Sequence, residues 1–353
     1  MKIQSLPPIP KIKIDSESLN LLNEIDKKLA RIDGCCLMDS DGFTIDLLKI
    51  REGLSSVAID YPIDTITELS KIYQSASTSQ ALLIDYKNSI ILGEKLIKNS
   101  SAITHALESI HKELLKGKNP SAGLFRTGCV WINDSAISKE ESKFIAPDDE
   151  EIIPMIIDLE NYIAGDVSYP AAINAGLIHA QFEMIHPFQS HNGLVGRILI
   201  QLYLLLKKKL SFSVLQLSNS LHKSRGEYFD RLEDLENNNN WSGWTKFFLE
   251  TINDAASETL WLFQKIFRQR DSDLKLLLEK SFVSTASINL LNYITKAPIF
   301  SIPLVTSKLG YTKQTMNLLI KKFEEEKIIT EISGKQRYRT YFYKALVDTL
   351  LHN

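Results

Sequence analysis

Cysteine is scarce in this sequence of 353 residues: it has three, of which Cys35 and Cys36 are adjacent and Cys129 stands alone. An odd number without a recurring spacing argues against both a disulfide framework and a cysteine-based zinc site. We therefore interpret the cysteines as free thiols in a reducing compartment, and we expect a cytoplasmic protein.

Long apolar runs and a strong net charge are also missing. The longest apolar stretch, about 198–206, is interrupted by Gln201 and followed by three lysines. A bilayer span takes about 20 apolar residues, and no apolar signal segment follows Met1, so we expect no membrane partner. The formal net charge of −2 gives no general attraction to nucleic acid, and such a partner needs a local basic patch.

Apolar residues recur at helical spacing over most of the chain, which predicts a mainly α protein of two or three domains. Helices are expected over about 16–33, 44–60, 67–77, 79–116 and most of 154–253, the last interrupted at 237–240. Asp15 or Ser16 is the predicted N-cap of the first helix, and Gly34 its predicted end. Its expected apolar face consists of Leu19, Leu22, Ile25, Leu29 and Ile32.

Two segments depart from the helical pattern. Residues 125–132 are rich in aromatic and β-branched residues and precede a polar turn at 133–135, so they predict a short β-hairpin. The last seventy or so residues read as a helix around 288–294, a helix over 302–309 stopped by Gly310, and a helix capped by Thr312. Strands over 328–332 and 338–343 follow, and this order is that of a winged helix-turn-helix.

The chemistry of the chain is concentrated in residues 186–197, HPFQSHNGLVGR. His186 precedes a proline, so it is expected in an extended loop, where it can accept a proton from an attacking hydroxyl. Asn192-Gly193 marks a turn at a helix start, whose free N–H groups attract anions, and Arg197 lies about one turn later. Together these parts suggest phosphoryl or nucleotidyl transfer, although a surface histidine, a plain turn and a solvated arginine are the ordinary alternatives.

This segment resembles the signature of the Fic (Fido) family, HPFx(D/E)GNGRxxR. The likeness extends to 125–132, which resembles the family's flap, and to 179–185, which resembles the helix entering the active loop. Residues 217–244, with Leu217-Ser218, Tyr228-Phe229 and two tryptophans, resemble the helices that follow. Residues 6–8 and 51–66 resemble the N-terminal helical region of long Fic proteins that end in a winged helix.

The resemblance implies a Fic-type helical bundle with a short β-hairpin flap and a C-terminal winged helix-turn-helix domain. The implied division is an N-terminal helical region at 1–115, a Fic core at 116–260 and the winged helix at 261–353. The implied activity is nucleotidyl transfer: AMP moves from ATP, the substrate, to an exposed Ser, Thr or Tyr hydroxyl of a target protein. A homodimer is compatible with this reading.

The same resemblance assigns roles to individual residues. His186 is the implied general base, and the flap, Gly128, Cys129, Val130 and Trp131, is implied to align the target as an extended strand. The residues implied to bind the nucleotide are Ser190, His191, Asn192, Gly193, Arg197 and Tyr228.

Three positions depart from the signature. Ser190 replaces the acid that holds magnesium, which weakens any Mg²⁺ site because this ion prefers carboxylate and phosphate oxygens; no protein-held metal is expected. His191 replaces a glycine at a position that can require an unusual backbone angle. Leu194 replaces an arginine and removes one positive charge from the phosphate site. We consider a degenerate site more plausible than recruitment of His191 as a metal ligand.

An inhibitory motif of the family, (S/T)xxxE(G/N), matches residues 56–61 with aspartate and tyrosine in place of its last two residues. The resemblance implies that Ser56 and Asp60 belong to an inhibitory helix and that Asp60 pairs with Arg197, as an exposed ion pair contributing about 0–1 kcal/mol. An ordinary helix end before Pro62 explains the same residues nearly as well.

The C-terminal segment leaves its partner open. Lys335, Arg337, Arg339 and Lys344 lie near the predicted wing and suit a phosphate backbone, whereas three consecutive glutamates at 324–326 do not. The sequence supports DNA binding and protein binding by this segment about equally. Two functions therefore remain: a Fic-type AMP transferase, and an inactive Fic fold that senses a nucleotide while its winged helix docks DNA or a protein.

Overall fold

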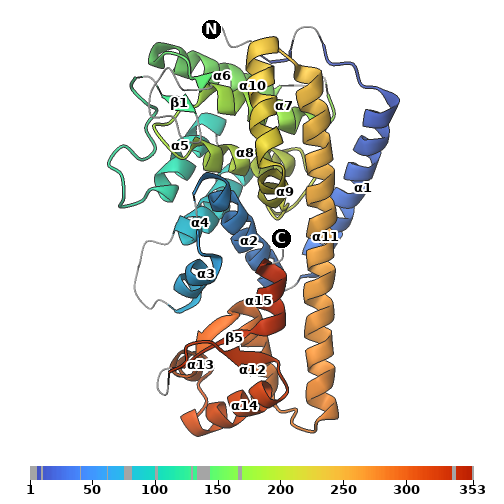
Figure 1. Cartoon of the computed structure of the whole chain (residues 1–353), viewed down its shortest axis with the longest axis vertical. Helices are drawn as coiled ribbons and strands as arrows, with labels where there is room; N and C mark the ends of the chain where they lie inside the picture. Colours follow the sequence, from blue (N-terminus) through green and yellow to red (C-terminus); the bar gives the residue numbers. More distant parts are fainter. Residues whose placement is uncertain are drawn as a thin grey trace.

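The computed structural model describes residues 6–8, 11–39, 41–61, 63–74, 82–99, 102–128, 130–132, 144–165, 169–335 and 339–351. Four features expected from the sequence lie outside these ranges: Pro62, Cys129, the turn at 133–135 and Arg337. Within them the chain is mainly helical (Figure 1). No helix of the described residues is long and apolar enough to cross a membrane.

The chain up to residue 279 forms a bundle of helices with one small strand pair. The helices up to the flap are α1 (Ser16–Met38), α2 (Phe43–Asp60), α3 (Thr65–Gln74), α4 (Leu82–Lys98) and α5 (Ile103–Leu114). The flap strands are β1 (Trp131–Ile132) and β2 (Phe144–Ile145). The helices after it are α6 (Asp149–Ala164), α7 (Ala171–Ile185), α8 (Asn192–Leu206), α9 (Leu217–Lys223), α10 (Arg225–Asn238) and α11 (Trp241–Glu279).

The first helix confirms its predicted cap but not its predicted end. The side chain of Asp15 accepts a hydrogen bond from the backbone N–H of Ser18 at 2.8 Å, which satisfies a free donor of the first turn. The helix continues through Gly34, because α1 packs along α11 and still buries Cys36 beyond that point. Leu19 is exposed rather than part of the buried face. The single helix expected over 79–116 is two helices, α4 and α5, packed side by side.

Helix α2 lies in the middle of the molecule (Figure 1) and buries polar as well as apolar side chains. The ammonium of Lys49 is 2.8 Å from the carboxylate of Glu94. Arg51 donates to Oε1 of Gln216 at 2.9 Å, and Glu52 accepts from the backbone N–H of Ser218 at 3.2 Å. Because buried polar groups are costly unless paired, these contacts fix the rotation of α2 and hence the place of its last turn.

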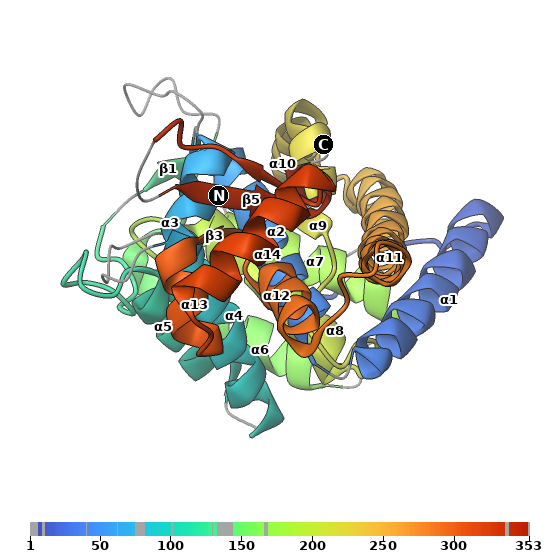
Figure 2. The ribbon, with the colours of Figure 1, turned by 90° about the horizontal axis from the view of Figure 1, so that it is seen from below.

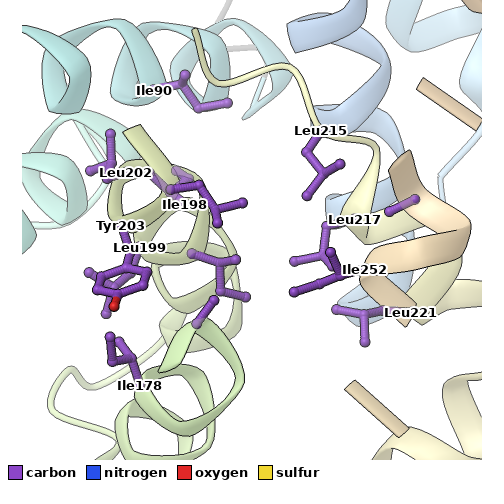
Figure 3. Close-up of a cluster of buried hydrophobic side chains, with 14 of the residues drawn as sticks. Ile90, Ile178, Ile198, Leu199, Leu202, Tyr203, Leu215, Leu217, Leu221 and Ile252 are labelled. Carbon is purple, nitrogen blue, oxygen red and sulfur yellow. The ribbon is translucent and has the colours of Figure 1, made fainter. Parts of the chain in front are cut away.

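The main apolar core contains side chains of every helix from α1 to α11. Figure 3 shows part of it, where α8 meets α7 and α4 on one side and the segment leading into α9 on the other. Its labelled side chains are Ile90, Ile178, Ile198, Leu199, Leu202, Tyr203, Leu215, Leu217, Leu221 and Ile252. This core holds the two helices that bracket the residues of the signature.

The C-terminal part has an apolar core of its own. Its elements are α12 (Thr285–Lys296), β3 (Ile299–Ser301), α13 (Ile302–Leu309), α14 (Lys313–Glu325), β4 (Ile329–Glu331), β5 (Thr340–Tyr343) and α15 (Lys344–Leu351). The strands form an antiparallel sheet in the order β3-β5-β4, of which β3 was not expected. Gly310 ends α13 with φ 71°, and the Thr312 hydroxyl caps α14 by accepting from the N–H of Thr315 at 3.1 Å.

The C-terminal part packs against helices of the preceding bundle. Helix α11 runs without a break past residue 260, where the sequence-based division ends the core. The C-terminal core includes Ile266 and Leu277 of α11, together with Phe43 and Leu47 of α2. The order of elements is compatible with a winged helix-turn-helix, which stays a prediction, as does the division into domains.

We predict that Gly176→Ala lowers the free energy of unfolding by about 1–3 kcal/mol, the usual cost of overpacking a core. A Cβ at this position of α7 would lie 2.7 Å from Cδ1 of the buried Phe248 on α11. Gly226→Ala in α10 is the control, since its Cβ would meet nothing within 4 Å, and it should be neutral or stabilise by up to about 1 kcal/mol. Urea unfolding measures both, and equal effects would contradict the close approach of α7 and α11.

Candidate active site

The signature residues form a tight loop between α7 and α8. His186 ends α7 with φ 49° and ψ 60°, and His191 precedes α8 with φ 61° and ψ 18°. Both are left-handed conformations, so the unusual angle expected at position 191 is present, at a cost of roughly 1–2 kcal/mol for a residue with a Cβ. His186 is therefore a helix cap rather than the extended residue that the following proline predicted.

The side chain of Asn192 holds this loop closed. Its Oδ1 accepts from the N–H of Phe188 at 2.8 Å and its Nδ2 donates to the carbonyl of Phe188 at 2.7 Å. Because both amide atoms are used inside the loop, any contact of Asn192 with a ligand falls to its backbone. The signature asparagine shapes the anion site rather than lining it with its side chain.

His186 is poised as a neutral base. Its Nδ1 lies 3.1 Å from the carbonyl oxygen of Glu183, and since a carbonyl only accepts, Nδ1 carries the hydrogen and Nε2 keeps its lone pair. Burial lowers the pKa of His186 to about 4, so the ring is unprotonated at neutral pH. The side chain is 16% exposed, which leaves it accessible to a reacting group.

Arg126 ties the loop to the flap. Its Nε donates to the carbonyl of His186 at 2.8 Å, and its Nη1 donates to the carbonyl of Gly128 at 2.6 Å. Beyond Gly128, which needs a glycine at φ 105°, Val130 accepts from the N–H of Ala146 at 3.1 Å. Strands β1 and β2 then pair antiparallel with Trp131 opposite Ile145, so the flap does contain a strand pair, although its second strand lies nine residues beyond the expected turn at 133–135.

His111 of α5 is a further support of the loop that the sequence did not reveal. Its Nδ1 accepts from the N–H of Gly123 at 2.9 Å, and its Nε2 lies 3.2 Å from the carbonyl of Ser190. The ring also stacks on Phe188 with 4.0 Å between centroids. Only the neutral ring with hydrogen on Nε2 satisfies both contacts, and burial lowers the pKa of His111 to about 4. No motif surrounds this histidine, so only its contacts identify it.

Arg197 is buried and is held by the end of α2. Its Nε donates to Oγ of Ser56 at 2.7 Å, and its Nη2 donates to the carbonyl of Ser56 at 3.0 Å and to Oδ2 of Asp60 at 2.5 Å. The structure thus brings together the two residues of the inhibitory motif and the last arginine of the signature. The Asp60 carboxylate is 27% exposed, whereas Arg197 is 1% exposed, so this is not the exposed ion pair that the sequence suggested.

The ion pair covers the first turn of α8. A Cβ at Gly193 would lie 2.9 Å from Nη1 of Arg197 and 3.3 Å from Oδ2 of Asp60. Only glycine fits under the pair without displacing it. The Asp60 carboxylate consequently sits at a helix N-terminus, where unpaired N–H groups favour an anion such as a phosphate oxygen.

The departures from the signature occupy distinct places. His191 Nδ1 lies 2.9 Å from Oγ of Ser190, and its ring packs against Tyr61, with 5.5 Å between centroids. Thus the two bulky residues that replace glycines of the two motifs contact each other. Leu194 is fully buried in the main core and does not line the site.

Tyr228 of α10 lies in a buried layer beside His179. The side chain is buried, and its hydroxyl lies 3.0 Å from Nε2 of the buried His179. Glu183 lies in the same layer, and burial raises its pKa to about 8, aided by Asp60 and opposed by Arg197. The nucleotide contact expected of Tyr228 stays a prediction, since its hydroxyl is engaged by His179 in the described state.

The residues near position 190 do not fit a protein-held magnesium ion. The hydroxyl of Ser190 is engaged by His191, and the nearby carboxylate of Asp60 is engaged by Arg197. Across the described parts of the chain, no group of three His, Cys, Asp or Glu side chains is placed to hold a metal. The site offers a neutral imidazole base beside an anion-binding helix end that a carboxylate occupies.

Comparison with known proteins agrees with this arrangement. The sequence model of the Fic/DOC family matches residues 102–204, and thus includes α5 and His111, before the expected start of the core at 116. The fold is similar to a Fic family protein from Desulfovibrio desulfuricans G20, with a TM-score of 0.59 at 16% identity over 94% of this chain and 97% of that one. A Fic domain containing signaling protein from Bacteroides thetaiotaomicron VPI-5482 has a TM-score of 0.51 at 14% identity, over 69% and 98%. At these identities the structural likeness concerns the fold.

We predict that His111→Ala loosens the loop while His111→Gln preserves it. A glutamine amide can donate to the Ser190 carbonyl and accept from Gly123, whereas alanine leaves a buried N–H unpaired, which costs about 1–3 kcal/mol. Hydrogen exchange of residues 188–193 should accelerate about tenfold or more in His111→Ala, because local opening becomes easier. Equal exchange in the two variants would show that the ring contributes only packing.

Proposed function

Residues 102–204 form a Fic/DOC family domain, and from that premise we propose that this protein transfers AMP from ATP to the hydroxyl of a target protein. We further propose that the described state is self-inhibited. The observation that carries the proposal is the placement of Arg197: it lies over Gly193 at the anion-binding end of α8 and is held there by Ser56 and Asp60.

In the proposed reaction His186 acts as the general base. Its Nε2 takes the proton of the attacking hydroxyl while the oxygen forms a bond to the α-phosphorus of ATP. The bond between that phosphorus and the bridging oxygen of the β-phosphate breaks, and pyrophosphate leaves. The low pKa of His186 keeps the base free of its own proton at neutral pH, and Arg126 fixes the position of the residue through its carbonyl.

Arg197 and the first turn of α8 supply the phosphate contacts. An arginine fork suits phosphate oxygens, and the backbone N–H groups at Asn192 and Gly193 complete an anion site. In the described state the Asp60 carboxylate takes the place of a phosphate oxygen on Arg197. A nucleotide must therefore compete with Asp60, and we propose that this competition restrains transfer.

The flap is proposed to hold the target. Gly128 and Val130 lead into β1, which pairs with β2 through its main chain. An extended target segment can add to such a hairpin by main-chain hydrogen bonds, and its Ser, Thr or Tyr hydroxyl would then face His186. Recognition by main-chain pairing demands an extended target segment more than a particular sequence.

A second function is favoured by specific observations. Ser190 provides no carboxylate for Mg²⁺, and His191 with Tyr61 fills space beside the loop. In this alternative the domain binds a nucleotide without transferring it, and the C-terminal part passes the signal to a partner. The two functions differ in one outcome, namely whether a covalent AMP group forms once Asp60 is removed.

The test of the base uses the Asp60→Ala background with ATP labelled at the α-phosphate and Mg²⁺ or Mn²⁺. Asp60→Ala should label itself, and adding His186→Ala should reduce the rate by about 100- to 10,000-fold, the usual contribution of a general base. Adding His105→Ala instead, an exposed histidine of α5, should change nothing. Labelling that survives His186→Ala within a few-fold would rule out this base, and tight ATP binding without labelling in Asp60→Ala would favour the nucleotide-sensing function.

The test of inhibition compares nucleotide affinity by calorimetry. Asp60→Ala should bind ATP at least about tenfold more tightly, because freeing the arginine removes a competing ion pair worth more than about 1.4 kcal/mol. Asp60→Asn, which keeps a hydrogen-bond acceptor but loses the charge, should lie between it and the wild type. Without nucleotide, Asp60→Ala should lower the free energy of unfolding by more than an exposed ion pair contributes, because Arg197 stays buried without its carboxylate partner. Weaker ATP binding in Asp60→Ala would mean that Asp60 supports the site.

A further inference from the structure

Positive charge is concentrated at the C-terminal end of the chain. Residues 285–351 contain ten Lys and Arg and five Asp and Glu, a formal charge of +5 in a protein whose total is −2. The remaining residues therefore carry −7. A local excess of this size attracts a polyanion to one part of the molecule only.

One face of α14 carries side chains suited to reading base edges. Its buried face, Met316, Leu319, Ile320 and Phe323, packs into the C-terminal core. The opposite face exposes Gln314, Asn317, Leu318 and Lys321, spaced as neighbours along one helix surface. Glutamine and asparagine pair with adenine, lysine with guanine, and an apolar side chain contacts the thymine methyl in the major groove.

Helix α14 lies at the end of the molecule opposite the flap and the α6 helix (Figure 1). In Figure 1 α14 is the lowest helix, far from the loop between α7 and α8, and the view from below shows α12, α13 and α14 in front (Figure 2). The N-terminal residues of a recognition helix contact bases. Here that end is capped by Thr312 and carries exposed Lys313 and Gln314.

The segment between β4 and β5 adds two basic side chains that can contact phosphate, and the acid of this hairpin is already hydrogen-bonded. Lys335 and Arg339 are exposed, and Nε of Arg339 donates to the carbonyl of Lys335 at 3.1 Å. Glu331, the acid of this hairpin, is engaged within it and accepts from the N–H groups of Ser333 and Gly334 at 2.7 and 3.1 Å.

The glutamates that weighed against nucleic acid lie at the other end of α14. Glu326 is 3.4 Å from Nζ of Lys280, and Glu325 is 3.7 Å from Nζ of Lys321. In a complex that inserts the N-terminal half of α14, this acidic end points away from the groove. The contacts thus favour DNA over the protein partner that the sequence left level with it.

We propose that the C-terminal part binds double-stranded DNA, with Gln314 and Asn317 of the N-terminal half of α14 in the major groove and Lys335 and Arg339 on the phosphate backbone. The inference is independent of AMP transfer, because none of these residues belongs to the site between α7 and α8. It predicts two separable contributions to DNA affinity, one electrostatic and one sequence-specific.

The electrostatic arm measures binding of the full chain to a fluorescent 30-base-pair duplex of random sequence at several salt concentrations. Wild type should bind more weakly as salt rises, because phosphate contacts release counterions. Lys335→Glu with Arg339→Glu should weaken binding about tenfold or more and reduce the salt slope by about 2. Lys27→Glu with Arg31→Glu, the same charge change on exposed residues of α1, is the control and should have little effect.

The specificity arm selects duplexes from a random pool with the wild type and compares an enriched sequence with a scrambled one. The wild type should bind the enriched duplex about tenfold or more tightly than the scrambled one. Gln314→Ala with Asn317→Ala should abolish this preference and leave the affinity for the scrambled duplex nearly unchanged. His186→Ala should bind both duplexes as the wild type does, which separates this result from the fate of the proposed transferase. The proposal is overturned if the wild type shows no salt-dependent binding of duplex DNA, or if the α1 control weakens DNA binding equally. It is also overturned if no sequence preference depends on α14. A protein partner would then be the remaining occupant.

Discussion

Burying the guanidinium of Arg197 is the constraint on which the site depends. Burial lowers the pKa of this group, but Asp60, together with Tyr228, Tyr86 and Glu183, raises it above the ordinary value and keeps the arginine charged. A buried cation needs a partner and filled hydrogen-bond positions, and Ser56 and Asp60 of α2 provide them. The last turn of α2 is thus part of the proposed active site, and Gly193 must lack a side chain because the ion pair lies above it.

Helix α2 can perform this task because both of its ends are anchored. Phe43 and Leu47 belong to the C-terminal core, while Glu52 and Ser56 are fixed in the buried polar layer near α8 and α9. One helix therefore connects the proposed DNA-binding part with Asp60, the residue proposed to compete with a phosphate for Arg197. Helix α11, continuous over 39 residues, provides a second connection along the edge of the molecule (Figure 1).

The loop between α7 and α8 shows how departures from a signature are accommodated. Its two left-handed histidines are costly, and the surrounding structure holds them by Arg126, His111 and the amide of Asn192. His191 gains a partner in Tyr61, which itself departs from the inhibitory motif. The hydroxyl of Ser190 lies 2.9 Å from Nδ1 of His191, so the loop holds its shape with a serine where the signature has an acid.

The sequence by itself determined the helical class, the caps at Asp15, Gly310 and Thr312, the flap segment and the signature loop, because these depend on periodicity and local turn chemistry. It also indicated that Asp60 and Arg197 are partners, through a motif 137 residues away along the chain. It did not reveal the burial of Arg197, the supports His111 and Arg126, the inward placement of Tyr228, or β3. Those features depend on which side chains meet from distant segments and how much water reaches them, and only the packing of α2, α5 and α10 against α8 and its loop decided that.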